Sequence, residues 1–476
     1  MTSPLLGTDT ISVCSDLGQK AIDMSARRAV HNIPGADFPD WYPSSSVVTA
    51  GPFAFTASMS GTDWATGELA SAAAPDSGLP LSTGHPVKLQ VRETYRKLDA
   101  ALTAVGSSLD AGVSINQWQP SYHGDVSRHE QMRDPYDLFW EDWRRVSHPY
   151  IQTRDEFLLS DRPASCLLPV DRLVAADTDI EVQLVSLLAD SGITKTAYAH
   201  DVHNPLGGYS VGVEAGPWVF SAGFIATDFE NGLHPKARVP AHIWYGNQVA
   251  QETEETLRQI RITMEAAGAH WKDVVKVVLY LTPEGMRNLP AVDEVWSKHW
   301  PTEPPARAVV PCSGIGGVKG GNVEIYVVVA RPDQGGDRQV IHTPNALDAL
   351  GHSVQAVRSG PLLFLSTQLG RSPSGASDYS ASSRRGMPHS RRHIADQVHR
   401  IHDGVAAICE AAGTSIENAV KVDAFLSDLS DLPAFFEAWR DPFADGLPAS
   451  GFFETPPGCQ EVPGCDLTVD LVVAMP

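Results

Sequence analysis

Two residues combine a side chain and a setting that could do chemistry on a small molecule. Arg307 ends a Pro-Ala-Arg tripeptide, and Glu324 stands near the start of a run of β-branched residues that ends at Ala330. A guanidinium group can hold a carboxylate through two parallel hydrogen bonds, and a carboxylate in a partly dry site can take up a proton and return it. The residue types alone leave open that Arg307 pairs with a surface carboxylate and that Glu324 faces solvent.

Histidines and cysteines are the other candidates for chemistry. Four histidines have spacings compatible with one helix, and two histidines four residues apart can bind a metal, but no third ligand is evident: His389, His393, His399 and His402. Six cysteines are scattered without a Cys-x-x-Cys motif: Cys14, Cys166, Cys312, Cys409, Cys459 and Cys465. We therefore expect reduced, structural thiols, with no metal, no disulfide framework and no organic cofactor.

The charge and length exclude several classes of protein. The chain has 36 basic and 57 acidic residues, a formal net charge of −21, which repels phosphate backbones and anionic membrane surfaces. No stretch approaches the roughly 20 apolar residues that span a bilayer, and the first residues lack a signal-peptide pattern. We expect a cytoplasmic protein with no nucleic-acid or membrane partner and, at 476 residues, about three domains.

A pattern of strands and helices is repeated along the chain, most clearly in its middle. Residues 216–226 are predicted to form a strand, 248–268 an amphipathic helix, 273–281 a strand, 292–300 a helix and 322–330 a final strand. In the long helix Val249, Leu257, Ile260 and Met264 have helical spacing. A unit with this pattern is a mixed sheet with two helices, which cover one face only, so its other face must be buried against neighbours.

The third and first copies repeat the pattern with decreasing fidelity. The third has its elements at 360–370, 397–413, 419–426, 432–443 and 465–474. The first has them at 51–61, 91–106, 136–146 and 178–189, with an insertion at 116–135. Polar connectors at 189–196 and 331–339 separate the copies. The predicted organisation is an N-terminal extension (1–40) followed by three repeats (41–190, 197–332 and 341–476).

The middle copy resembles the RidA/YjgF family over its whole length, and the third copy follows it. The resemblance implies an α+β, chorismate-mutase-like fold and, because members form homotrimers with active sites in clefts between subunits, a single-chain pseudo-trimer. Further association of whole chains stays open.

The residues that carry the resemblance lie in the middle copy. The Pro-Ala-Arg signature and the Glu of the last strand are Arg307 and Glu324, the glycine of the first-strand motif is Gly223, and the Tyr of the Tyr-Ser segment is Tyr209. The first copy has Ser165, Glu181, Ser58 and Pro43 at these positions, and the third has Ser450, Thr468, Thr367 and His352.

The resemblance implies a role for each of the four residues. Arg307 is expected to hold the substrate carboxylate, and Glu324 to exchange a proton with the attacking water. Gly223 is expected to let the backbone approach the ligand, and Tyr209 to close the pocket and donate a hydrogen bond.

The leading functional hypothesis is hydrolysis of a small enamine or imine of the 2-imino acid type to the carbonyl compound and ammonia. The expected partner is a small-molecule carboxylate. One alternative is a chorismatase-like lyase or hydrolase that acts on a larger carboxylate. Another is a non-catalytic, ligand-binding pseudo-trimer.

Overall fold

The computed structural model describes residues 27–476, apart from 32, 37, 75–84, 122–145, 200–207, 229–231, 241–245, 317, 319, 374–391 and 445. All structural statements below concern the described residues.

Three sheets share one strand order. The first is β1 (Arg28–Val30), β2 (Val47–Ala50), β3 (Phe53–Thr56), β9 (Glu181–Leu187), β6 (Gly112–Pro120) and β7 (Ala164–Val170). The second is β10 (Thr196–Tyr198), β11 (Gly212–Ala215), β12 (Trp218–Ser221), β16 (Val323–Ala330), β14 (Val274–Leu281) and β15 (Ala306–Pro311), with β13 (Phe224–Ile225) beside β16. The third is β17 (Gln339–Ile341), β18 (Ala356–Ser359), β19 (Leu362–Leu365), β23 (Leu467–Ala474), β21 (Ala419–Leu426) and β22 (Ala449–Glu454), with β20 (Gln368–Leu369) beside β23.

Each sheet is mixed in the same way. Its last two strands in the order above run parallel, and its other pairs are antiparallel. A short strand of the first copy, β8 (Arg172–Leu173), extends the third sheet by pairing with β22, and β4 (Thr62–Asp63) forms a separate hairpin with β5 (Glu68–Leu69). The first copy and the third sheet are therefore tied together by backbone pairing as well as by side chains.

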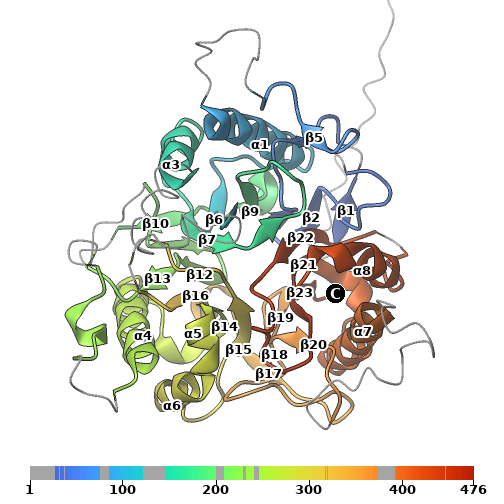
Figure 1. Cartoon of the computed structure of the whole chain (residues 1–476). Coiled ribbons are helices and arrows are strands. Elements are labelled where there is room, and N and C mark those ends of the chain that lie inside the picture. Colours follow the sequence, from blue (N-terminus) through green and yellow to red (C-terminus); the bar gives the residue numbers. More distant parts are fainter. Residues whose placement is uncertain are drawn as a thin grey trace, which may run out of the picture.

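The helices lie outside the three sheets, which face one another around the middle of the molecule (Figure 1). The first sheet carries α1 (Pro86–Thr103) and α3 (His148–Arg154), the second α4 (Gln248–Ala266), α5 (Pro283–Arg287) and α6 (Leu289–His299), and the third α7 (Arg392–Ala412) and α8 (Leu432–Trp439). Helix α4 begins where the Asn247 side chain accepts a hydrogen bond from the Ala250 N–H at 3.0 Å. Its apolar residues Val249, Leu257, Ile260 and Met264 are buried, as their spacing predicts.

Both faces of each sheet are buried, because alternate residues of a strand point to opposite faces. On β16, Val323, Ile325 and Val327 pack into the core beneath the helices, whereas Tyr326 and Val328 pack into cores shared by all three sheets. Every residue of β14 is buried. The face that the helices leave uncovered is thus buried against the other two sheets, within one chain.

Two predictions about the first copy need correction, and a third falls mostly outside the described residues. Residues 28–30, expected in an N-terminal extension, form the edge strand β1, which pairs with β2. The expected insertion at 116–135 begins inside β6, because residues 112–120 pair on both sides with β7 and β9. The helix expected at 136–146 falls almost wholly outside the described residues, and the observed helix α3 begins at His148. The rest of the insertion also lies outside the described residues.

Within the described part of the chain, no helix is long and apolar enough to cross a membrane.

Candidate functional site

Strand register identifies equivalent positions in the three sheets. Arg307, Ser165 and Ser450 lie opposite Val277, Ile115 and Val422 of the adjacent parallel strands. Three residues further along those strands, Tyr280, Trp118 and Phe425 lie opposite Glu324, Glu181 and Thr468. The backbone geometry therefore matches Arg307 with two serines, and Glu324 with one glutamate and one threonine.

Equivalent backbone hydrogen bonds join each sheet to the next. The Gly223 N–H donates to the Ser165 carbonyl at 3.0 Å, the Thr367 N–H to the Arg307 carbonyl at 2.9 Å, and the Ser58 N–H to the Ser450 carbonyl at 3.0 Å. We call these places the first–second, second–third and third–first junctions. The Arg307 position of one sheet thus faces the Gly223 position of the next.

Arg307 and Glu324 do not lie in the same junction. Arg307 points to the helix side of its sheet, where its guanidinium packs over the Trp296 ring at 5.3 Å. Glu324 alternates with Val323 and Ile325, which point to the helix side, and so faces inward. Their Cα atoms are separated by two strand spacings and three residues along β14, roughly 14 Å. The four predicted site residues of the middle copy are therefore divided between two junctions.

The first–second junction holds Glu324 and Gly223. The Glu324 side chain is buried, and burial raises its pKa to about 8, although a hydrogen bond with Cys166 acts in the opposite direction. A Cβ at Gly223 would lie 2.0 Å from Glu324 Oε1 and 2.7 Å from Cys166 Sγ. The absence of a side chain at position 223 is what leaves room for the carboxyl group.

Tyr209 belongs to the same junction. The next residue, Ser210, donates its N–H to the Pro163 carbonyl of the first copy at 3.3 Å. Burial raises the pKa of the Tyr209 hydroxyl, nearby Glu324 and Cys166 raise it further, and Arg154 lowers it. The structure therefore brings Tyr209, Gly223 and Glu324 together, beside Cys166 and Arg154 of the first copy.

The second–third junction contains Arg307. Its Nη1 donates to Asp293 Oδ1 at 2.5 Å, and its Nη2 reaches the Leu350 carbonyl at 3.4 Å. Thr468 takes the Glu324 position, but a second carboxyl group, Glu461, comes from the loop before β23. Burial raises the pKa of Glu461 to about 6, with Arg307 lowering it, and its Oε2 has no hydrogen-bond partner among the described residues.

The third–first junction contains Glu181, which accepts a hydrogen bond from Ser58 Oγ at 2.7 Å. Burial raises the pKa of Glu181 to about 7. Its Oε1 and the buried hydroxyl of Tyr42 have no hydrogen-bond partners in the described part of the chain. The three junctions thus have the same backbone frame and different side chains.

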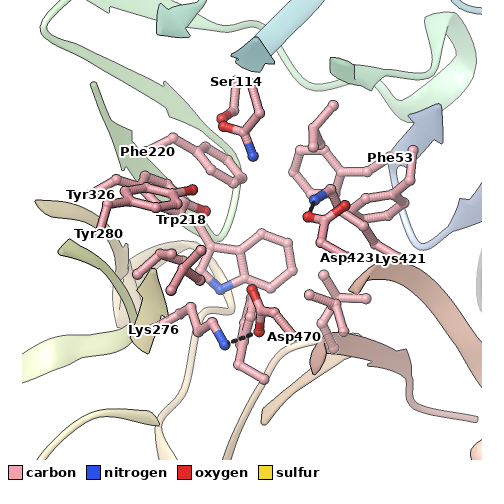
Figure 2. Close-up of a pocket in the computed structure, with 18 of the residues that line it drawn as sticks. Phe53, Ser114, Trp218, Phe220, Lys276, Tyr280, Tyr326, Lys421, Asp423 and Asp470 are labelled. Carbon is pink, nitrogen blue, oxygen red and sulfur yellow. Dashed lines mark hydrogen bonds and ion pairs between the residues drawn. The ribbon is translucent and has the colours of Figure 1, made fainter. Parts of the chain in front are cut away.

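A further cavity, whose lining Figure 2 shows, is not lined by Arg307, Glu324, Gly223 or Tyr209. Residues from all three sheets line it, and two ion pairs face it: Lys276 with Asp470 at 2.5 Å, and Lys421 with Asp423. The Gln183 side chain donates to Asp423 Oδ1 at 2.5 Å. The cavity has a volume of about 50 Å³, which suits one or two water molecules and is too small for an amino-acid-sized substrate.

The described histidines of this group have different neighbours, and His393 lies 3.5 Å from Asp466. His389 lies outside the described residues, His399 pairs with Asp441 at 3.4 Å, and His402 packs on the Trp439 ring. Burial lowers the pKa of His402 to about 4. Among the described residues there is no group of three potential metal ligands.

Sequence reasoning missed three residues that the structure brings to the junctions: Cys166, Glu461 and Arg154. Cys166 and Arg154 belong to the copy that lacks the arginine signature, and Glu461 lies in a loop outside the repeated pattern. Strand pairing between copies could not be deduced from one copy at a time. The one available signal was that Arg154 precedes Ser165, the last residue of the first copy's tripeptide, by the same number of residues as Trp296 precedes Arg307.

Comparisons with known proteins agree with the repeated pattern. A family model described as Endoribonuclease L-PSP matches residues 200–331 and 343–456, together more than half of the chain. A RutC family protein of Pyrococcus horikoshii is 29% identical over 112 residues, 24% of this chain and 80% of that protein. The human 2-iminobutanoate/2-iminopropanoate deaminase is 26% identical over 117 residues, 25% of this chain and 77% of that protein.

Among solved structures, a chorismatase is similar over 77% of this chain and 93% of its own, with 13% identity and a TM-score of 0.45. The first matched segment of the family model contains Arg307, Glu324, Gly223 and Tyr209, and the second covers most of the third copy. On this evidence the chain belongs to the RidA/YjgF family, whose model carries the description Endoribonuclease L-PSP.

Proposed function

We propose that the chain hydrolyses a small 2-imino or 2-enamino acid to the 2-oxo acid and ammonia, with Glu324 as the acid–base group at the first–second junction. The observation that carries the proposal is the Glu324 carboxyl group, buried beside the bare backbone of Gly223 with a pKa of about 8. A carboxyl group with a pKa near neutrality can both donate and accept a proton at the pH of a cell. The human relative named as an imine deaminase supports this class of reaction.

The chemistry requires little more than orientation and proton transfer. Water adds to the C=N carbon while Glu324 gives its proton to the imine nitrogen. The resulting carboxylate takes a proton from the added water and returns it to the nitrogen, which becomes an ammonium leaving group. Glu324 then accepts the hydroxyl proton as the C–N bond breaks, so that ammonia and the 2-oxo acid are released and the carboxyl group is protonated again. Because the imine is labile, a few kcal/mol of transition-state stabilisation accounts for useful acceleration. Neither a metal nor an organic cofactor has a part in this scheme.

The proposal includes a pseudo-trimeric arrangement with three non-equivalent junctions. It is supported by the common strand order of the sheets and by the equivalent backbone hydrogen bonds at Gly223, Thr367 and Ser58. Glu324 and Tyr209 act at the first of these junctions. Arg307 serves the second–third junction, where its ion pair with Asp293 and its contact with the Leu350 carbonyl hold the adjoining segment.

The rate of loss of 2-iminobutanoate, generated in situ, tests the proposal. The wild type is expected to accelerate hydrolysis, and Glu324→Gln to reduce kcat by about 100-fold or more. The matched control is Glu181→Gln, because Glu181 is a buried carboxyl group at the equivalent strand position of another junction. Equal loss in both variants, or none in Glu324→Gln, would remove Glu324 from the reaction.

A further inference from the structure

Arg154 stands where the other two copies bury a tryptophan. It precedes Ser165 by eleven residues, Trp296 precedes Arg307 by eleven, and Trp439 precedes Ser450 by eleven. Both tryptophans are fully buried, and Arg154 is only 2% exposed. In the first copy the strand arginine is thus replaced by serine, while a helix tryptophan is replaced by arginine.

The two arginines make equivalent contacts with the following copy. Arg154 Nη2 donates to the Gly208 carbonyl at 2.7 Å, and Arg307 Nη2 reaches the Leu350 carbonyl at 3.4 Å. Gly208 precedes β11, and Leu350 precedes the equivalent strand, β18. Each guanidinium also pairs with an aspartate of its own copy, Asp155 at 3.1 Å and Asp293 at 2.5 Å. The guanidinium groups therefore reach corresponding places in two junctions from different elements.

The short Ser165 side chain is part of the exchange. Ser165 Oγ accepts a hydrogen bond from Gln117 Nε2 at 2.9 Å, and the Gln117 Oε1 atom lies 3.5 Å from Arg154 Nη1. An arginine at position 165 would compete with Arg154 for this space. Tyr150 contributes too, since its hydroxyl donates to Gln117 Oε1 at 2.6 Å and its ring lies 5.9 Å from the Arg154 guanidinium carbon.

We propose that Arg154 binds the carboxylate of the substrate at the first–second junction, in place of the strand arginine that this junction lacks. The inference rests on the proposed function, since it names the group that would hold the acid on which Glu324 acts. A buried guanidinium is costly unless it is paired, and Asp155 and the Gly208 carbonyl occupy Nε and Nη2. Among the described residues Nη1 makes only the 3.5 Å contact with Gln117, so this nitrogen has donor capacity left for a ligand.

Tyr209 connects the arginine to the acid–base group. Its hydroxyl lies within electrostatic reach of both Glu324 and Arg154. A 2-imino acid carries its carboxylate on the atom next to the C=N carbon, so a binding cation and an acid–base group must flank one small molecule. Arg154 and Glu324 lie on the two sides of the same junction, whereas Arg307 and Glu324 do not.

Binding of 2-oxobutanoate, measured by calorimetry on the full chain, tests the inference separately from turnover. Arg154→Met is expected to weaken binding by about 10- to 100-fold, the usual range for losing a charge-assisted pair. The matched control is Arg331→Met, since Arg331 is also largely buried and ion-paired, with Glu214 and Asp333, away from the junctions. It is expected to bind 2-oxobutanoate as the wild type does.

A double variant separates a binding role from a folding role. Arg154→Trp combined with Ser165→Arg rebuilds the pair seen as Trp296 and Arg307, and it is expected to recover binding that Arg154→Trp alone loses. The inference would be overturned if Arg154→Met bound 2-oxobutanoate as the wild type does, or if a folded double variant did not recover binding. It would also be overturned if the wild type did not bind 2-oxobutanoate. Binding that depends on Arg154 without imine turnover by the wild type would sustain the inference and refute the proposed function.

Discussion

Arg307 and Glu324 belong to neighbouring parts of one sheet, yet their side chains leave it on opposite faces. Arg307 packs on Trp296 of α6, and Glu324 faces Cys166 of the first copy. A substrate of a few heavy atoms cannot reach both, because the sheet itself lies between them. These residues of the middle copy therefore lie in two different junctions.

This separation predicts different effects of two substitutions. Glu324→Gln is expected to abolish most imine hydrolysis, whereas Arg307→Met is expected to lower kcat/KM by less than about threefold, provided that the variant is folded. Arg307→Met also removes the ion pair with Asp293, so its melting temperature is measured alongside. If Arg307→Met lost as much turnover as Glu324→Gln, the active site would have to include the second–third junction.

Gly223→Ser is predicted to disable the site without unfolding the chain. The equivalent positions carry Ser58 and Thr367, so the backbone there accepts a side chain. At position 223 the new Cβ would lie within 3 Å of Glu324 and Cys166 and would displace the carboxyl group. We expect kcat to fall by about tenfold or more while the denaturation midpoint changes little. Thr367→Ser is the matched control, because it makes a small change at the equivalent position of the second–third junction. We expect it to leave turnover unaltered.

The raised pKa of Glu324 predicts how stability varies with pH. The carboxyl group of the unfolded chain loses its proton near its ordinary pKa of 4.5, whereas the folded chain keeps it until about pH 8. The folded state therefore binds more protons between these values, and this contribution to stability is lost as the pH rises from about 5 to 8. Glu324→Gln is expected to flatten that part of the curve of melting temperature against pH.

Glu181→Gln provides the comparison, since the pKa of Glu181 is raised only to about 7. Its effect should end at a lower pH than that of Glu324→Gln. Identical curves for the wild type and both variants would mean that neither carboxyl group holds its proton in the folded chain.

The central ion pair predicts a large effect of removing one partner. Lys276 is fully buried and is neutralised by Asp470 at 2.5 Å, with the Leu365 carbonyl as a second acceptor. Asp470→Ala leaves that charge without its counterion, so we expect a loss of about 3 to 5 kcal/mol in the free energy of unfolding. Denaturant titration measures it.

The double variant Lys276→Met with Asp470→Leu is expected to recover most of this stability, because no uncompensated charge remains. If Asp470→Ala unfolds at the wild-type midpoint, the pair does not stabilise the packing of the second sheet against the third.

Much of the fold could be predicted from the chain itself. The periodicity of residues 248–268 predicted α4, and the β-branched runs predicted β14 and β16, because local pattern and burial agree in these elements. The first copy was predicted least well: β1 and β6 were taken for an extension and part of an insertion. Neither has a clear alternating pattern of apolar residues, and both are strands because they pair with β2, β7 and β9.

By itself, the sequence predicted three copies of one pattern, identified the family that they resemble, and determined that the middle one carries Arg307, Glu324, Gly223 and Tyr209. Only the tertiary structure decided which of these residues meet. The pairing of distant segments decides which face each side chain of β16 takes and sets the order of β16, β14 and β15. It also brings Gly223 into contact with Ser165. These same contacts bring Arg154, from a helix of the first copy, close to Tyr209 and Glu324. Two copies build each junction, so the sequence of one copy cannot show which residues meet there.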